Sequence, residues 1–326
     1  MTFHSHPKPY ADVLETIGWT PLIRLSRIGA GLRTPIYGKA EYQNPGGSVK
    51  DRIGIAMIEA AERAGELRPG GTIVEGTSGN TGVGLAMAAA LKGYRCVFTM
   101  PDKMSQEKVK LLRAYGAEVV ITPTAVPPDH PDNYIMKAKQ IVHDTPGAIL
   151  ANQHFNQINP EAHYATTGPE IWEQMEGRVD AWLAGAGTGG TFTGVARYLK
   201  ERNPNCWCVV VEPQGSILKG GEAGPHEVEG IGASSFIPPV LDMSVADEVI
   251  QIEDAPAFAM VRRLAGEEGV LGASSAGANV AAALQVCEKL GPGKRVVTLI
   301  PDAAERYMSK GIYTKWAKPP APDHAD

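Results

Sequence analysis

Residues 44–52 read Asn-Pro-Gly-Gly-Ser-Val-Lys-Asp-Arg, which places Lys50 in the first turn of a predicted helix. Ser48 is a suitable N-cap, and the apolar pattern of the helix begins after residue 52. A helix N-terminus carries partial positive charge, so it would lower the pKa of the Lys50 amine. A lowered amine pKa suits a lysine that forms a Schiff base. On this segment alone, a solvated surface lysine balanced by Asp51 is the simpler interpretation.

Two more glycine-rich loops change that balance. Residues 77–82 read Thr-Ser-Gly-Asn-Thr-Gly, and residues 185–191 read Gly-Ala-Gly-Thr-Gly-Gly-Thr. Each loop joins a predicted strand to a predicted helix, where hydroxyls and backbone N–H groups favour a carboxylate or a phosphate. A third loop, 272–277, also starts a helix, and helix capping alone would explain its two serines.

The loop 185–191 has a second interpretation, because it also matches the dinucleotide-binding fingerprint at Gly185, Gly187 and Gly190. Glu212 ends the next predicted strand, where an acidic ribose ligand would be expected. This alternative predicts an NAD-binding oxidoreductase, but it gives no role to the lysine or to the other polar loop. A phosphate loop, a lysine on a separate helix and a carboxylate loop together favour a pyridoxal phosphate site.

Length and composition narrow the class of protein. The chain has 326 residues, 43% of them hydrophobic, and a formal net charge of −5. We therefore expect two domains and no nucleic-acid partner. No run of 18 apolar residues and no apolar signal segment occur, so we expect no membrane span and no secretion. The four cysteines show no spacing of a redox or zinc pair, which favours a reducing cytoplasm. The eight histidines show no metal-ligand spacing, so we expect no metal.

Predicted strands and helices alternate along the chain. The strands are expected at 72–75, 95–100, 118–122, 181–185, 208–212 and 295–300. This alternation predicts an α/β fold with mainly parallel sheets. The polar stretch 215–239 has no clear period, and a loop of that length predicts a functional lid.

Taken in this order, the motifs 44–52, 77–82 and 187–191 resemble those of the fold type II (tryptophan synthase β-like) family of pyridoxal phosphate enzymes. This family includes cysteine synthase and cystathionine β-synthase, and the resemblance covers roughly residues 12–316. It implies two domains, each a mainly parallel sheet flanked by helices, and a homodimer. Residues 1–45 with 149–316 would form the larger cofactor-binding domain, 46–148 a smaller movable domain with the substrate carboxylate loop, and 317–326 a tail.

The resemblance also implies roles for individual residues. Lys50 would hold pyridoxal phosphate as an internal aldimine and act as the general base and acid. The other cofactor contacts would be Asn80 at the ring hydroxyl, Ser275 at the ring nitrogen, Gly187, Thr188, Gly189, Gly190 and Thr191 at the phosphate, and Pro301 and Asp302. The small-molecule substrates would contact Thr77, Ser78, Gly79, Thr81, Gln153, Glu229 and Gly230.

Two members of the family are similar to different segments. Cystathionine β-synthase is similar at 101–109, 159–164, 227–232 and 301–310, whereas 167–172 and the short chain resemble cysteine synthase. Glu229 stands where cysteine synthases usually have a neutral residue, which implies a contact with the amino group of homocysteine; a solvated lid charge is the alternative. The implied reaction is β-replacement on L-serine, or an activated serine, through an aminoacrylate. Homocysteine would give cystathionine; the alternative is cysteine from O-acetylserine and sulfide.

Departures from the family pattern set further expectations. The first cysteine is Cys96, so the haem that animal cystathionine synthases bind near their N-terminus is not expected. Residues for their C-terminal nucleotide-binding repeats are absent as well, so regulation through those repeats is not expected. Gly76 replaces the usual proline before the substrate loop. His154 stands where cystathionine synthases commonly have tyrosine, and we interpret it as a structural residue.

Overall fold

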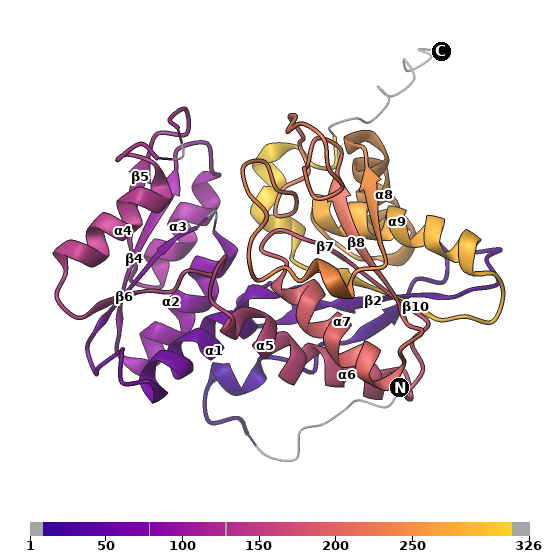
Figure 1. Cartoon of the computed structure of the whole chain (residues 1–326), viewed down its shortest axis with the longest axis horizontal. Helices are drawn as coiled ribbons and strands as arrows, with labels where there is room; N and C mark the ends of the chain where they lie inside the picture. Colours follow the sequence, from indigo (N-terminus) through magenta and orange to yellow (C-terminus); the bar gives the residue numbers. More distant parts are fainter. Residues whose placement is uncertain (1–8, 78, 128, 315–326) are drawn as a thin grey trace, which may run out of the picture.

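The computed structural model describes residues 9–77, 79–127 and 129–314, and its strands form two sheets (Figure 1). The larger sheet has the strand order β1-β2-β10-β7-β8-β9, and the smaller sheet has the order β5-β4-β3-β6. Every neighbouring pair is parallel except β1 with β2. The predicted α/β fold with mainly parallel sheets is confirmed.

The larger sheet is buried on both faces. Its strands are β1 (Leu22–Arg24), β2 (Ile36–Ala40), β7 (Ala181–Gly185), β8 (Trp207–Pro213), β9 (Glu248–Ile252) and β10 (Val296–Ile300). Side chains alternate along β10, so Val296 and Ile300 pack into one core while Val297 and Leu299 pack into the other. The sequence did not predict β1, β2 or β9.

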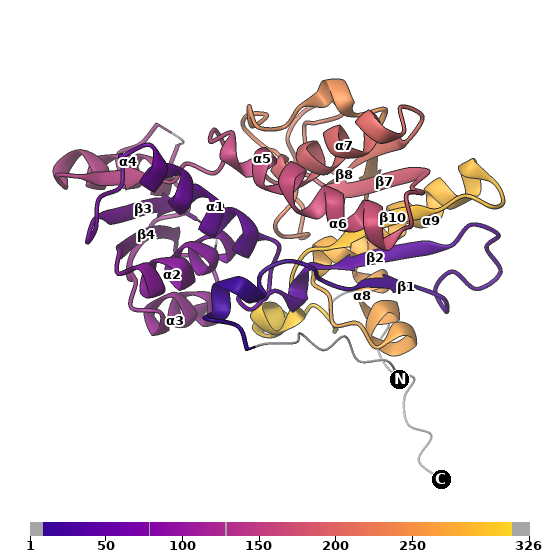
Figure 2. The same ribbon diagram turned by 90° about the horizontal axis from the view of Figure 1, so that it is seen from below.

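Helices cover both faces of this sheet. They are α5 (Ile158–Ala165), α6 (Thr167–Gln174), α7 (Gly190–Arg202), α8 (Asp254–Glu268) and α9 (Ser274–Leu290). Figure 2 shows α6 and α7 on one face and α8 on the other. The sequence did not predict α5 and α6, each of which has a proline at its third residue. The first turn of a helix tolerates proline, because its N–H groups have no partner within the helix.

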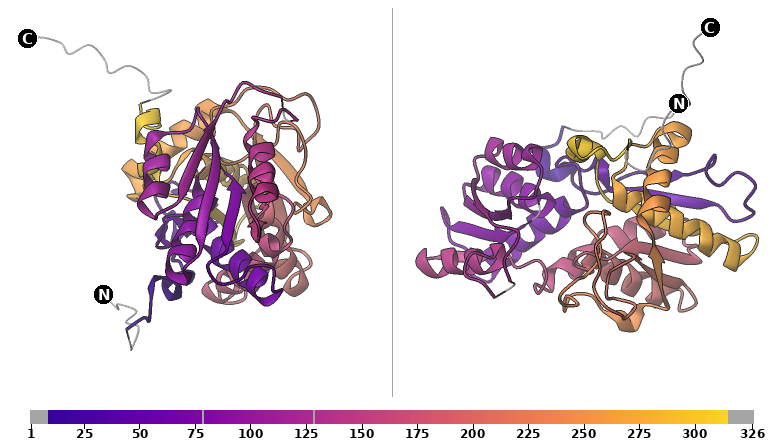
Figure 3. Two further views of the ribbon diagram at one scale, coloured as in Figure 1. Left: turned by 90° about the vertical axis from the view of Figure 1, so that its left-hand side faces the viewer. Right: turned by 90° about the horizontal axis from the view of Figure 1, so that it is seen from above.

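The smaller sheet is also covered on both faces. Its strands are β3 (Thr72–Gly76), β4 (Arg95–Pro101), β5 (Glu118–Thr122) and β6 (Ala148–Leu150), and its helices are α1 (Lys50–Arg63), α2 (Asn80–Lys92), α3 (Gln106–Ala114) and α4 (Tyr134–Asp144). Two separate apolar clusters put α1, α2 and α3 on one face and α4 on the other (Figure 3). The expected boundary at residue 148 cuts through β6, which pairs with β3 and extends this sheet to residue 150.

Close packing of α1 on α2 fixes where the lysine helix begins. A Cβ atom added to Gly54 would lie 2.3 Å from the carbonyl carbon of Gly84, and one added to Gly84 would lie 2.5 Å from the Lys50 carbonyl oxygen. Only glycine at both positions allows the two backbones to approach this closely.

The predicted lid, residues 215–239, contains no helix or strand. Short 3-10 helices elsewhere are η1 (Val13–Thr16), η2 (Glu41–Gln43), η3 (Met243–Val245) and η4 (Ala304–Lys310). Across the part of the chain that the structure describes, no helix combines the length and apolar character required to span a bilayer. The expected tail, 317–326, lies outside the described residues.

Candidate active site

A cavity of about 600 Å³ lies between the two sheets. Residues from the smaller sheet and its helices, such as Asn80 and Tyr134, form one side, and Thr188 and Ser275 belong to the other. Lid residues 226–232 complete the lining. The cavity is large enough for a cofactor together with an amino acid.

Most of the predicted site residues line this cavity. They are Lys50, Asn80, Thr81, Gln153, Gly187, Thr188, Gly189, Thr191, Glu229, Gly230, Ser275, Pro301 and Asp302. Thr77, Gly79 and Gly190 are not among the lining residues, and Ser78 lies outside the described residues.

Lys50 is the first residue of α1 and lies beside the cavity. Burial lowers the pKa of its amine, and the carboxylates of Asp302 and Glu41 oppose that shift. Burial is the largest cause of this lowered pKa, and a further contribution from the field of the helix stays a prediction. The predicted N-cap is displaced by one residue: Val49 occupies that position, and Ser48 Oγ accepts a hydrogen bond from the Lys50 backbone N at 3.2 Å.

The interpretation of Lys50 as a solvated lysine balanced by Asp51 is wrong. Asp51 is fully buried, and its Oδ2 accepts a hydrogen bond from the Gly46 backbone N at 2.6 Å. Burial raises the pKa of Asp51 to about 7, although the Gly46 N–H lowers it. This carboxylate therefore braces the glycine loop in front of the lysine.

The glycine-rich loop 185–191 forms an anion cradle at the start of α7. The helix begins at Gly190 after Gly189, whose φ is +88°. A Cβ atom on Gly187 would lie 2.3 Å from the Gly230 carbonyl oxygen, so the lid backbone closes directly over the loop. Backbone N–H groups at the helix start and the hydroxyls of Thr188 and Thr191 suit a phosphate group. These residues therefore fit the phosphate of pyridoxal phosphate.

The dinucleotide alternative required Glu212 to be available for a ribose. Glu212 is buried, and its carboxylate accepts hydrogen bonds from the backbone N of Leu218 at 2.9 Å and of Lys219 at 3.0 Å. It is not among the residues that line the cavity. This carboxylate instead holds the first residues of the lid.

The loop 77–82 packs against the segment that carries Gln153. Thr81 Oγ1 donates a hydrogen bond to Gln153 Oε1 at 2.6 Å. The carboxylate of Glu75 accepts from the backbone N of Asn152 at 2.6 Å and of Gln153 at 3.3 Å. Burial raises the pKa of Glu75 to about 7. Thr77, the first residue of this loop, is buried, and its Oγ1 accepts a hydrogen bond from the Gly79 backbone N at 3.1 Å.

Asp302 joins the cavity to the η4 segment. Its Oδ2 accepts hydrogen bonds from Asn80 Nδ2 at 2.8 Å and from the Tyr307 hydroxyl. Its Oδ1 is buried and has no partner among the described residues. Sequence reasoning gave no role to Tyr307 or Arg306, although both lie in the segment 301–310 that the resemblance singled out.

Glu229 is held by two lysines rather than solvated alone. Lys108 Nζ lies 3.0 Å from its Oε2, and Lys310 Nζ lies 3.2 Å from its Oε1. Burial would raise the pKa of Glu229, but the two lysines outweigh it and the pKa is lowered. The Glu229 backbone N also donates to Ser274 Oγ at 3.0 Å, which ties the lid to the start of α9.

His154 lines the cavity, and its ring meets that of Phe236 edge-on, with centroids 5.8 Å apart. Its Nδ1 is buried and has no partner among the described residues. Burial, with the charge of Lys50 as a second cause, lowers the pKa of His154 to about 4. The imidazole is therefore neutral near pH 7.

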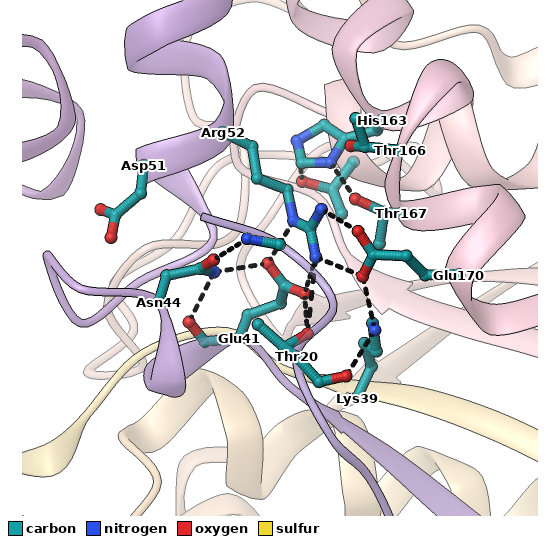
Figure 4. A network of polar contacts seen from close by, with 12 residues as sticks. Thr20, Lys39, Glu41, Asn44, Asp51, Arg52, His163, Thr166, Thr167 and Glu170 are labelled. Carbon is teal, nitrogen blue, oxygen red and sulfur yellow. Dashed lines mark hydrogen bonds and ion pairs between the residues drawn. The ribbon is translucent and has the colours of Figure 1, made fainter. Parts of the chain in front are cut away.

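A buried network of charges anchors α1 to the larger sheet (Figure 4). Arg52 Nε lies 2.7 Å from Glu41 Oε2, and Arg52 Nη1 lies 2.6 Å from Glu170 Oε1. Lys39 Nζ donates to Glu170 Oε2 at 2.7 Å and to the Thr20 carbonyl oxygen at 2.6 Å. Two cations and two carboxylates thus fix the helix that carries Lys50.

Comparison with known proteins gives consistent matches. A family model described as "Pyridoxal-phosphate dependent enzyme" matches residues 13–302. The cystathionine β-synthase of Oryctolagus cuniculus is 49% identical over 318 residues, which are 95% of this chain and 58% of that protein. The cysteine synthase of Staphylococcus aureus (strain N315) is 49% identical over 309 residues, which are 94% of this chain and 98% of that protein. The chain thus spans little more than half of the first relative and nearly all of the second.

Two solved structures are similar across almost the whole fold. The O-acetylserine dependent cystathionine β-synthase from Helicobacter pylori gives a TM-score of 0.89 at 42% identity, covering 94% of this chain and 99% of that one. A hydrogen sulfide-producing enzyme from Fusobacterium nucleatum gives a TM-score of 0.86 at 41% identity, covering 92% and 100%. The two solved structures share the fold of this chain, and the names of the four relatives describe different reactions.

Proposed function

The chain belongs to the family of pyridoxal-phosphate dependent enzymes, and on that premise we propose that it joins L-serine to L-homocysteine to form L-cystathionine. Within that family it is a β-replacement enzyme of the group that contains cystathionine β-synthase and cysteine synthase. Pyridoxal phosphate, the cofactor of this group, supplies an electron sink for a negative charge at the amino acid's α-carbon.

Lys50 is proposed as the cofactor lysine and as the base that moves the α-proton. Because burial lowers its pKa, its Nζ is neutral more often than that of an exposed lysine, and a neutral amine can accept a proton. The same Nζ can then give this proton to the departing hydroxyl of serine, which leaves as water. It can next take the proton of the homocysteine thiol as the sulfur bonds to the β-carbon, and deliver that proton to the α-carbon.

The rest of the proposed site binds and orients. The loop 187–191 would hold the phosphate, Asn80 would contact the ring hydroxyl and Ser275 the ring nitrogen. The loop 77–82 and Gln153 would hold the carboxylate of serine. The Thr81 bond to Gln153 supports this assignment, because it fixes the amide beside the helix start of α2.

The charged side chains beside the lid would determine which thiol the enzyme prefers. Glu229 and its two partners, Lys108 and Lys310, all line the cavity. Homocysteine has an ammonium and a carboxylate, so it can pair with one anion and one of two cations. Sulfide has neither group and would gain nothing from these side chains.

Cysteine synthesis from O-acetylserine and sulfide is the second candidate. It is favoured by the cysteine synthase relative, which is as similar as the cystathionine β-synthase and is matched over 98% of its length. Acetate also leaves more easily than hydroxide, so this reaction needs less help from Lys50.

Product analysis by mass spectrometry separates the two candidates. The purified protein is given L-serine with L-homocysteine in one mixture, and O-acetylserine with sulfide in another. Efficient formation of cystathionine in the first mixture supports the proposal. Cysteine formed in the second mixture, without cystathionine in the first, would favour cysteine synthesis instead.

We also propose that residues 46–150 form a movable domain and that two copies of the chain form a dimer. The position of the cavity between the two sheets supports the first proposal, since a relative movement would change its width. Light scattering coupled to gel filtration tests the second against the chain mass of 34.6 kDa.

A further inference from the structure

Two side chains of α5, four residues apart, contact the two threonines of the loop 187–191 from behind. Asn159 Nδ2 lies 3.0 Å from Thr188 Oγ1, and His163 Nε2 lies 3.1 Å from Thr191 Oγ1. Residues at this spacing share one face of a helix. We propose that this face of α5 orients both hydroxyls as donors toward a bound phosphate; the proposal rests on the assignment of that loop as the phosphate site.

Close packing of α5 on α7 makes these contacts possible. A Cβ atom on Gly194 would lie 2.2 Å from the Pro160 carbonyl oxygen and 2.8 Å from the Cβ of His163. Any larger residue at this point of α7 would push α5 away from the threonines.

The partners of Asn159 determine the direction of its bond to Thr188. Asn159 Nδ2 also donates to the Gln153 carbonyl oxygen at 2.9 Å, and a carbonyl can only accept. Thr188 Oγ1 is therefore an acceptor from Asn159, and it accepts from the Gly190 backbone N at 3.4 Å as well. Its own hydrogen is left for a group in the cavity, which Thr188 lines.

His163 completes the same arrangement at Thr191. The histidine is fully buried, its Nδ1 lies 2.8 Å from Thr167 Oγ1, and Figure 4 shows its ring close to Arg52 and Thr167. Burial, with the charge of Arg52 as the next cause, lowers the pKa of His163 to about 3, so the ring is neutral. If Thr167 donates to Nδ1, the hydrogen on Nε2 is donated to Thr191. The Thr191 hydrogen is then directed to the phosphate.

The first test reads the tautomer of His163 in the unaltered holoenzyme. Histidine labelled with ¹⁵N is followed by long-range ¹H–¹⁵N correlation spectra, and His163 is assigned by its absence in His163→Gln. We expect a hydrogen on Nε2 and none on Nδ1 between pH 6 and 8.5. A hydrogen on Nδ1, alone or on both nitrogens, would overturn the proposal.

The second test measures the dissociation constant of pyridoxal phosphate by equilibrium dialysis. Thr191→Val and His163→Leu should each weaken binding about tenfold or more, the scale of one hydrogen bond to a charged group. The double variant should be no weaker than Thr191→Val alone, because the two changes remove one chain of bonds. His163→Gln, which keeps a donor near the Nε2 position, should restore binding to within about threefold.

The matched control is Thr166→Val, whose hydroxyl donates to the Ala162 carbonyl oxygen at 2.7 Å and not to the loop; it should leave binding unchanged. Independent, multiplying effects of His163→Leu and Thr191→Val would mean that His163 is only structural. If Thr188→Val and Thr191→Val both bind normally, the phosphate assignment itself fails. The tautomer measurement still decides the matter if His163→Leu does not fold, because its assignment needs only His163→Gln.

Discussion

Arg306 Nη1 donates a hydrogen bond to Asn80 Oδ1 at 2.6 Å, so a residue of η4 orients the first side chain of α2. Because the amide oxygen is engaged, the amide nitrogen of Asn80 is directed at Asp302 and the cavity. The guanidinium also lies against the glycine loop before Lys50, since a Cβ on Gly47 would lie 2.8 Å from Arg306 Nη2. One side chain thus links the lysine loop to the proposed ring-hydroxyl contact.

Replacing Arg306 should therefore weaken cofactor binding. Arg306→Met frees the Asn80 amide to rotate, and we expect the dissociation constant of pyridoxal phosphate to rise about tenfold. The dissociation constant of Arg306→Lys should lie between those of the unaltered protein and Arg306→Met, because an ammonium keeps the charge but lacks the two parallel N–H donors of a guanidinium. Equilibrium dialysis measures the effect, with the exposed Lys294→Met as the control. Normal affinity in Arg306→Met would show that Asn80 needs no such support.

Glu75 should make the stability of the protein depend on pH. Burial raises its pKa from 4.5 to about 7. Between these values the unfolded chain loses its proton first, so the native state binds more protons and the free energy of unfolding falls as the pH rises. Above pH 7 both states are ionised and the loss is complete, at about 3 kcal/mol at most.

Glu75→Gln should remove that loss, because glutamine imitates the protonated acid. Relative to the unaltered protein, the variant should gain stability from pH 4.5 to pH 8 in urea unfolding. An equal difference at the two pH values would contradict the raised pKa of Glu75. Asp51 is present in both proteins, so its own raised pKa cancels in the comparison.

Removing Arg52 should be strongly destabilising. Burial would raise the pKa of Glu41, but Arg52 outweighs it and lowers the pKa to about 2. Arg52→Met would leave Glu41 and Glu170 without their shared partner, which should cost about 3–5 kcal/mol of unfolding free energy. The exposed pair Arg263–Glu267 is the control, since Arg263→Met should change stability by less than about 0.5 kcal/mol. Similar losses in both variants would mean that the buried network has no special role.

Glu229 should discriminate between thiol substrates. Glu229→Gln removes the carboxylate that pairs with Lys108 and Lys310, so the KM for homocysteine should rise about tenfold. The KM for sulfide should stay unchanged in this variant, because sulfide has no ammonium group that could pair with Glu229. An unchanged homocysteine KM would rule out the contact and leave Glu229 as a brace of the lid.

The sequence predicted those parts of the site that depend on short motifs. Lys50 and the loop 187–191 are recognisable because each lies at a helix start that follows a glycine-rich turn. Contacts between distant segments could not be predicted in this way: Arg306 and Asn80 are 226 positions apart. The first turns of α5 and α6 were also missed, since their prolines usually indicate a loop. The position of His154 in the cavity depends on packing against Phe236, which no local pattern encodes.

The central claim is that the chemistry is centred on Lys50, and borohydride reduction followed by peptide mapping tests it most directly. Reduction fixes pyridoxal phosphate permanently on the amine that holds it. We predict that mass spectrometry finds the added pyridoxyl group on Lys50, and that Lys50→Ala loses both the label and β-replacement activity. Labelling of another lysine in the active holoenzyme, such as Lys108 or Lys310, or activity retained by Lys50→Ala, would contradict the account.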